Sequence, residues 1–176
     1  MLGTGLLIFI ACLALVLVVV HFQPEDFSIS RSAVLSAAPS VIFGHINDLH
    51  KWEAWSPWVK MDPNAKSSYE GPAAGTGAIA RWDGNKQVGA GSMTIVESKP
   101  GELIRIRLDF LKPFKATSTA EFKFMSRGEQ TEVTWTMYGK NNFIGKMISF
   151  VMDCEKMVGG QFEEGLANLK SVVEKG

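Results

Sequence analysis

KMVGGQFEEGLANLKSVVEK, residues Lys156–Lys175, is the stretch on which the fold depends. Its apolar residues recur every three or four positions, which is the period of one face of an α-helix. The charged residues lie mostly on the opposite side, so this stretch predicts one long amphipathic helix at the end of the chain. Its apolar stripe consists of Val158, Phe162, Leu166, Leu169 and Val173.

In the middle of the chain the apolar residues alternate with polar ones, which predicts β-strands. The short turn sequences DGN, KPGE, LKPF and RGEQ separate these segments. Consecutive strands joined by short turns form an antiparallel meander. The expected strands are Ala78–Asp83, Gln87–Ser98, Glu102–Phe110, Lys115–Phe124 and Thr131–Tyr138.

Two further elements precede the meander. Residues Phe27–Ser36 predict a strand, although Arg31 interrupts the alternation. Pro39 is placed to begin a helix, because the first turn of a helix does not need its missing N–H group. The order of strand, helix, meander and long helix fits an α+β fold in which a curved antiparallel sheet surrounds the C-terminal helix.

The first residues predict a transmembrane anchor. Leu2–Val20 contains no charged residue, and nineteen helical residues span about 28 Å, close to the hydrocarbon thickness of a bilayer. A cleaved signal peptide would begin with basic residues and end at a small-residue site, and neither is present. Cys12 lies inside the apolar run rather than after it, which disfavours a lipoprotein signal and any disulfide with Cys154.

These boundaries divide the chain into an anchor (residues 1–21), a linker (22–26) and one domain (27–176). We expect a single-pass membrane protein. The first thirty residues contain no Lys or Arg, so loop charge hardly defines the orientation. We place the domain outside the cytoplasm as the working expectation.

The tryptophan-rich stretch WEAWSPW, Trp52–Trp58, follows the first predicted helix. Together with GKNNF (139–143), GGQFEEGLANLK (159–170) and the order of elements, it resembles the START-like, helix-grip (SRPBCC, Bet v 1-like) superfamily, in particular its polyketide cyclase/dehydrase-like branch. The resemblance implies an apolar cavity between the sheet and the C-terminal helix. It also places the tryptophans near the mouth of that cavity, where we expect at least one to be buried and one to line the entrance.

The strand pattern selects candidate pocket residues independently. On Lys115–Phe124 the inward side chains are small at one end and large at the other, as in a chamber; interdigitation in a filled core is the alternative. The predicted pocket residues are Trp55, Trp58, Trp82, Ile106, Leu108, Phe110, Ala116, Ser118, Ala120, Phe122, Trp135, Met137, Phe143, Met147, Met157 and Phe162.

Few residues carry recognisable chemistry. The formal charge is zero, which disfavours a nucleic-acid partner. The sequence GTGAIA (75–80) matches G-x-G-x-x-A but precedes a strand, which excludes a dinucleotide site. His45 and His50 are five residues apart and do not form a metal pair on a helix. Glu97 and Asp109 are expected to form outward ion pairs with Arg105 and Arg107. No catalytic residue, metal or cofactor is predicted.

Three classes of function fit these features. The first is binding or carriage of a hydrophobic small molecule or lipid at a membrane, with the N-terminal helix as the attachment. The second is a protein-interaction module without a small ligand, whose protein partner the sequence does not identify. The third is a cyclase/dehydrase-type enzyme, which would require polar groups inside the cavity, where the inward sets offer only Ser118.

The run NNFIGKMISFVMDCE, Asn141–Glu155, predicts a second helix that is apolar on more than one side. Asn141 or Asn142 is placed to cap it. The surplus apolar surface suggests a mobile lid between the cavity and a bilayer or partner. Packing of the second side beneath the C-terminal helix is the alternative.

Overall fold

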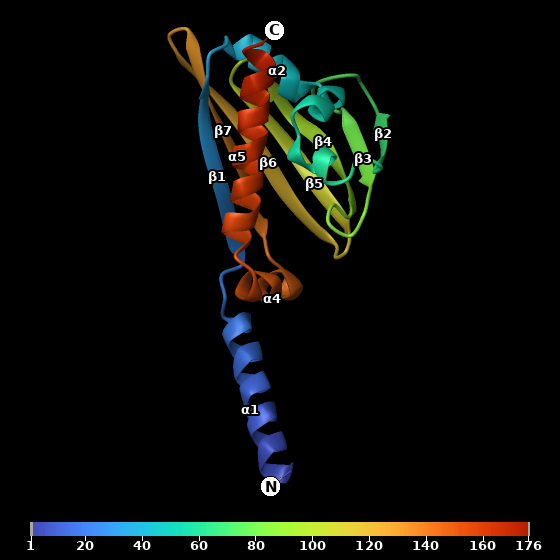
Figure 1. Ribbon diagram of the computed structural model, residues 1–176, viewed down its shortest axis with the longest axis vertical. Helices are drawn as coiled ribbons and strands as arrows, with labels where there is room; N and C mark the ends of the chain where they lie inside the picture. Colours follow the sequence, from blue (N-terminus) through green and yellow to red (C-terminus); the bar gives the residue numbers. More distant parts are fainter. Residues whose placement is uncertain (1, 176) are drawn as a thin grey trace.

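The computed structural model of the protein describes residues 2–175, and side chains from residue 5 to residue 175. Figure 1 shows a sheet with helices against one face and a separate N-terminal helix that extends away from it. The elements, in chain order, are α1 Leu2–His21, β1 Asp26–Leu35, α2 Pro39–Asn47, the 3₁₀-helix η1 Leu49–Ala54, α3 Pro57–Met61, β2 Lys66–Glu70, β3 Ile79–Asp83, β4 Ala90–Lys99, β5 Leu103–Lys112, β6 Ala116–Arg127, β7 Gln130–Lys140, α4 Phe143–Val151 and α5 Cys154–Val173.

The sheet has seven strands in the order β1-β7-β6-β5-β4-β3-β2. All neighbouring strands are antiparallel, and β1 joins the meander by pairing with β7 along its full length. The expected α+β architecture, with an antiparallel sheet and a long C-terminal helix, is therefore confirmed. The edge strand β2 was not predicted: its sequence, KSSYE, is polar and almost wholly exposed, so it carries no alternating apolar pattern.

The boundary between the last two helices differs from the prediction. One expected helix ran through Glu155, but α4 ends at Val151 and α5 begins at Cys154. The reason is a cap: the side chain of Asp153 accepts a hydrogen bond from the backbone N–H of Lys156 at 3.0 Å, which starts a new helix. Asn142 caps α4 in the same way: its side-chain oxygen accepts a hydrogen bond from the backbone N–H of Gly145 at 2.9 Å. Of the two predicted caps, Asn141 and Asn142, the second is therefore confirmed.

The predicted stripe of α5 packs on the sheet. Phe162, Leu166, Leu169 and Val173 are buried and Val158 is half-buried. Two glycines on this side, at positions 159 and 165, allow the helix to approach closely: a Cβ at Gly165 would lie 2.8 Å from the Trp135 ring. The helix therefore rests tightly on β1 and the neighbouring β7.

Arg31 does not interrupt the alternation of β1. Its partner across β1 and β7 is Trp135, and it shares the inner face with Ile29. The guanidinium lies under α5, where it bonds Glu155 at 2.8 Å and Glu163 at 2.5 Å. An inward arginine is tolerated here because these two carboxylates satisfy its charge.

Helix α1 leaves the domain at the end where α4 lies (Figure 1). Among the described residues, no helix has the combination of length and hydropathy that a membrane crossing requires. The transmembrane anchor expected from the sequence is not supported by this result.

Candidate ligand site on the concave face of the sheet

The predicted pocket residues lie mainly on the inner face of the sheet, in rows that cross the strands. In one row Met93 of β4 is opposite Leu108 of β5, which is opposite Ser118 of β6. In the next row Ile106, Ala120 and Met137 are consecutive partners. Since side chains alternate along a strand, members of these rows point to the same side.

One half of this face, toward α2 and η1, is filled by an aromatic cluster. Trp135 stacks on Phe162 with ring centroids 4.2 Å apart and lies 4.7 Å from Phe122. Trp52 and Trp55 pack edge-on against the same rings. Four predicted pocket residues thus contact one another in a packed core: Trp55, Phe122, Trp135 and Phe162.

The stretch WEAWSPW forms this cluster because its backbone turns twice. Trp52 lies on η1 and donates its indole N–H to the carbonyl of Ile46 at 2.9 Å, while Trp55 donates to His45 at 3.3 Å. Pro57 then begins α3, which carries Trp58. Trp52 and Trp55 are buried, whereas Trp58 is only half-buried and lies 5.7 Å from Trp135 at the edge of the cluster.

The other half of the inner face is covered less completely. We call it the apolar floor: the half-buried side chains of Met93, Leu108, Phe110 and Met137, with the small buried residues Ser118 and Ala120 between them. Trp58 borders the floor on the side of the cluster. Half-buried apolar side chains in adjacent rows give a continuous apolar surface, which is typical of a site that meets another molecule.

Trp82 borders the opposite end of the floor. Its ring covers Gly91, at which a Cβ would lie 2.6 Å from the indole, and it meets Phe110 edge-on at 6.0 Å. The indole N–H donates to the carbonyl of Val88 at 3.3 Å, which holds the ring across the sheet. Glycine at position 91 is therefore required for this ring to lie flat on the strand.

A hollow of about 420 Å³ adjoins the floor at the tip of the β5–β6 hairpin. This volume falls within the range of small-molecule sites, roughly 300–1,000 Å³. Its wall includes Phe110 and Ala116, both predicted pocket residues on the inner face, and also Asp109 and Thr117 of the outer face, where Thr117 donates to Asp109 at 2.9 Å. The remaining lining residues are Leu111 and Lys115.

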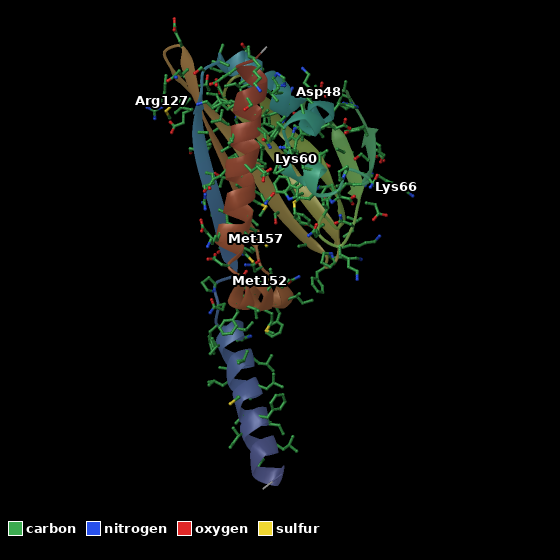
Figure 2. The ribbon with its side chains drawn as sticks, viewed as in Figure 1. Asp48, Lys60, Lys66, Arg127, Met152 and Met157 are labelled. Carbon is green, nitrogen blue, oxygen red and sulfur yellow. The ribbon has the colours of Figure 1, made fainter. Side chains whose placement is uncertain are left out.

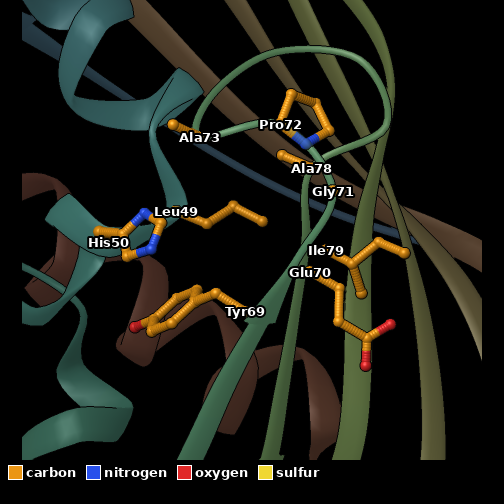
Figure 3. A pocket seen from close by; sticks show the side chains of 9 residues that line it. All are labelled: Leu49, His50, Tyr69, Glu70, Gly71, Pro72, Ala73, Ala78 and Ile79. Atoms are coloured by element: carbon orange, nitrogen blue, oxygen red, sulfur yellow. The ribbon is translucent and has the colours of Figure 1, made fainter.

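A second hollow was not foreseen from the sequence. It measures about 240 Å³ and lies between η1, β2 and the loop before β3 (Figure 3). His50 stacks on Tyr69 there with centroids 4.0 Å apart, and burial raises the pKa of the Tyr69 hydroxyl, as does nearby Glu53. Because its volume is below the usual range for ligands, we do not assign it as the main site.

Four predicted pocket residues lie apart from the floor. Ala116 is exposed at the start of β6, and Phe143 and Met157 are about half exposed on α4 and α5. Met147, on α4, is half-buried. The structure gathers these residues near the end of the domain from which α1 extends; Figure 2 marks Met157 and neighbouring Met152 there.

Polar chemistry around the floor is limited to a few groups. Ser118 is buried in it. Three buried side-chain atoms of the described residues have no hydrogen-bond partner: Nδ1 of His45, Nε1 of Trp135 and Oε1 of Gln161. The described residues contain no group of side chains that could hold a metal ion.

The charged residues singled out in the sequence lie on the outer face of the sheet. Arg105 bonds Glu97 on β4 and Glu121 on β6, as predicted for an outward ion pair. Asp109 bonds Arg107 at 2.8 Å within one strand rather than across two. Burial lowers the pKa of His45, and nearby Lys51 lowers it further, so this imidazole is neutral at pH 7.

A curved antiparallel sheet with an aromatic core beneath a C-terminal helix defines a helix-grip protein. Residues 26–174 match a family model described as polyketide cyclase / dehydrase and lipid transport. Because this match covers most of the sequence, the protein belongs to that family. None of the curated proteins matches the chain.

Solved structures support the same fold. Protein CV1439 from Chromobacterium violaceum has 16% identity and a TM-score of 0.61, over 84% of this chain and 96% of its own. Protein MLL2253 from Mesorhizobium loti has 9% identity and a TM-score of 0.63, over 85% and 98%. Ara h 8.0201 has 8% identity and a TM-score of 0.55, over 86% and 99%.

Proposed function

We propose that the protein binds a hydrophobic small molecule or lipid on the apolar floor, and that α1 attaches the domain to a membrane. The observation that carries the first part is the floor itself. Its central side chains, including Met93, Leu108 and Met137, lie on the inner face of a helix-grip domain but are only half-buried. An apolar ligand would remove this remaining surface from water, which is favourable in proportion to its area.

The family description supports this ligand class, since it includes lipid transport. Ser118, the one polar side chain of the floor, suits a ligand that carries one polar group on an apolar body. A hydroxyl or carbonyl of the ligand that bonds the Ser118 side chain would add affinity and orientation. We therefore favour an amphiphilic ligand over a pure hydrocarbon.

Membrane attachment is supported by the surface of α1. Twenty residues form this helix, and its large apolar side chains are exposed on all sides between Leu6 and Val19, with Phe9 at 65% and Leu7 at 69%. Such a surface is unfavourable in water and favourable in lipid. Among the described side chains of α1, which begin at residue 5, only Val20 at the domain end is fully buried.

Photo-crosslinking tests the ligand site. The full chain would be reconstituted into nanodiscs with a phospholipid that carries a diazirine on its acyl chain, irradiated and mapped by peptide mass spectrometry. We expect crosslinks on β4 and β5 at Met93 and Leu108, in addition to α1. Labelling restricted to α1 would contradict lipid binding on the floor while leaving the membrane attachment intact.

Vesicle sedimentation tests the attachment. The full chain should remain with phospholipid vesicles after washing in alkaline carbonate. A variant with Ile10→Lys, Leu13→Lys and Leu17→Lys should be released, because charged side chains are expensive in lipid. Release of the unmodified chain would contradict the proposal. A reporter fused to the C-terminus would then identify the side of the membrane on which the domain lies. We propose that the domain lies outside the cytoplasm.

A further inference from the structure

Helix α4 buries its charged side chain and exposes its apolar ones, which is the reverse of an ordinary surface helix. Lys146 is its one charged residue and is the buried one, at 8% exposure. In contrast, Phe143, Ile144, Phe150 and Val151 are exposed by 44–77%. In water a helix turns its apolar side to the core, so this arrangement indicates that the outer surroundings of α4 are apolar.

Contacts of the buried lysine fix α4 at the base of α1. The Lys146 ammonium donates to the carbonyl of His21, the last residue of α1, at 3.3 Å, and lies 3.5 Å from the carboxylate of Glu25. The backbone N–H of Asn141 donates to the backbone carbonyl of Glu25 at 2.7 Å. Helix α4 is thus held across the exit of α1, as Figure 1 shows.

The β5–β6 hairpin reaches the same end of the domain. Asn142, which caps α4, lies with its side-chain amide 3.5 Å from the carbonyl of Lys115 in that hairpin. Leu111 and Phe114 in the hairpin are also exposed, by 54% and 49%. Two separate segments next to α1 therefore present large apolar side chains in the same region.

We propose that these two segments form a collar that inserts into the lipid surface around α1. The collar consists of Leu111, Phe114, Phe143, Ile144, Phe150 and Val151. A phospholipid bilayer is the occupant because the collar surrounds the exit of α1 and continues its apolar surface. This inference rests on the proposed attachment of α1 and deepens it, since α1 alone would leave the domain free to turn above the membrane.

The collar has a consequence for the ligand. Leu111 lies both in the collar and on the wall of the 420 Å³ hollow, and that hollow adjoins Phe110 of the apolar floor. With the collar in lipid, the hollow faces the bilayer. Phe110, which the hollow shares with the floor, then lies between the bilayer and the floor.

Depth-resolved quenching tests the collar. Cys12 and Cys154 of the full chain would be replaced by Ser, and single cysteines placed at Leu111, Val151 or, as a control, Met125. Met125 is also apolar and is 60% exposed, but it lies near Arg127 at the opposite end of the domain (Figure 2). Each cysteine would carry an NBD label in phospholipid vesicles containing a lipid with a nitroxide near its headgroup.

We expect at least twofold quenching at positions 111 and 151 and essentially none at position 125. Equal, low quenching at all three positions in protein that sediments with the vesicles would overturn the collar but not the attachment of α1. Protein that stays in the supernatant would overturn the attachment, and the collar with it.

Discussion

The indole of Trp135 stacks on the ring of Phe162, with centroids 4.2 Å apart and planes only 11° from parallel. This contact joins the central sheet to α5, and Trp52, Trp55 and Phe122 pack around it. It divides the inner face of the sheet into a filled half and the less covered apolar floor. The packed core and the proposed ligand site therefore use different residues of one face.

Removal of the Phe162 ring should be strongly destabilising. Phe162 is 2% exposed, and a buried Phe→Ala change typically costs about 3–5 kcal/mol of unfolding free energy, since it leaves a cavity. The control Met125→Ala, at an exposed apolar residue, should change it by less than about 0.5 kcal/mol. Urea unfolding of the full chain in detergent, followed by tryptophan fluorescence, measures both. Similar losses for the two variants would show that the cluster does not hold α5.

Adjacent glycines of α5 should respond oppositely to the same substitution. A Cβ at Gly159 would overlap the guanidinium of Arg31, which Glu155 and Glu163 hold in place, whereas a Cβ at Gly160 would meet no atom within 4 Å. Gly160→Ala should stabilise the protein by about 0.5–1 kcal/mol, because alanine loses less backbone entropy in a helix. Gly159→Ala should lack this gain and lower the midpoint of urea unfolding.

Equal stabilisation by both alanines would mean that the arginine moves aside without cost. The charge-neutralising variant Glu163→Gln provides a second measurement. It should weaken the ion pair that positions Arg31. The difference in urea midpoint between Gly159→Ala and Gly160→Ala should then become smaller.

Acid should weaken the ion pairs of the outer face. Burial opposes ionisation of Glu121, but hydrogen bonds from Lys123 and Arg105 outweigh it, so the pKa of the carboxyl is lowered. A lowered folded-state pKa gives stability that is present above the unfolded pKa of about 4.3 and is lost as the pH falls through the folded-state value. Glu121→Gln should therefore cost about 1–2 kcal/mol at pH 7 and progressively less below pH 4.

Urea midpoints between pH 7 and pH 3 measure this difference. The control Glu70→Gln removes an ion pair with Arg81 in which both side chains are about half exposed, and its effect should be much smaller. A penalty for Glu121→Gln that is independent of pH would contradict the electrostatic explanation.

The sequence predicted the parts of the fold that have a regular apolar period. The stripe of α5 and the five meander strands were foreseen, because Val133 and Phe162, for example, recur in phase with their neighbours. The edge strand β2 was not foreseen, because its polar residues pair through the backbone only. The predicted helix Asn141–Glu155 included Asp153, which in the structure caps α5. The sequence did not predict this cap because capping depends on local backbone geometry.

The site was less predictable than the fold. The inward direction of Trp135 and Leu108 followed from alternation along their strands. Which inward residues pack and which remain half-buried depends on where WEAWSPW folds, and alternation contains no information on that. Hence one list of pocket residues combined the aromatic cluster, the apolar floor and exposed residues such as Phe143. The buried position of Lys146 had no sequence signal, because it follows from the contact of α4 with α1.

Native mass spectrometry of the full chain released from nanodiscs tests the central claim, that the apolar floor binds a hydrophobic molecule. Met93→Lys places a charge on the floor, and Thr94→Lys places the same charge at the next residue, on the opposite face of β4. We predict a bound lipid or other apolar molecule on the unmodified protein and on Thr94→Lys, reduced at least tenfold on Met93→Lys. Equal occupancy of the two variants, or an unmodified protein without any bound molecule, would contradict the account.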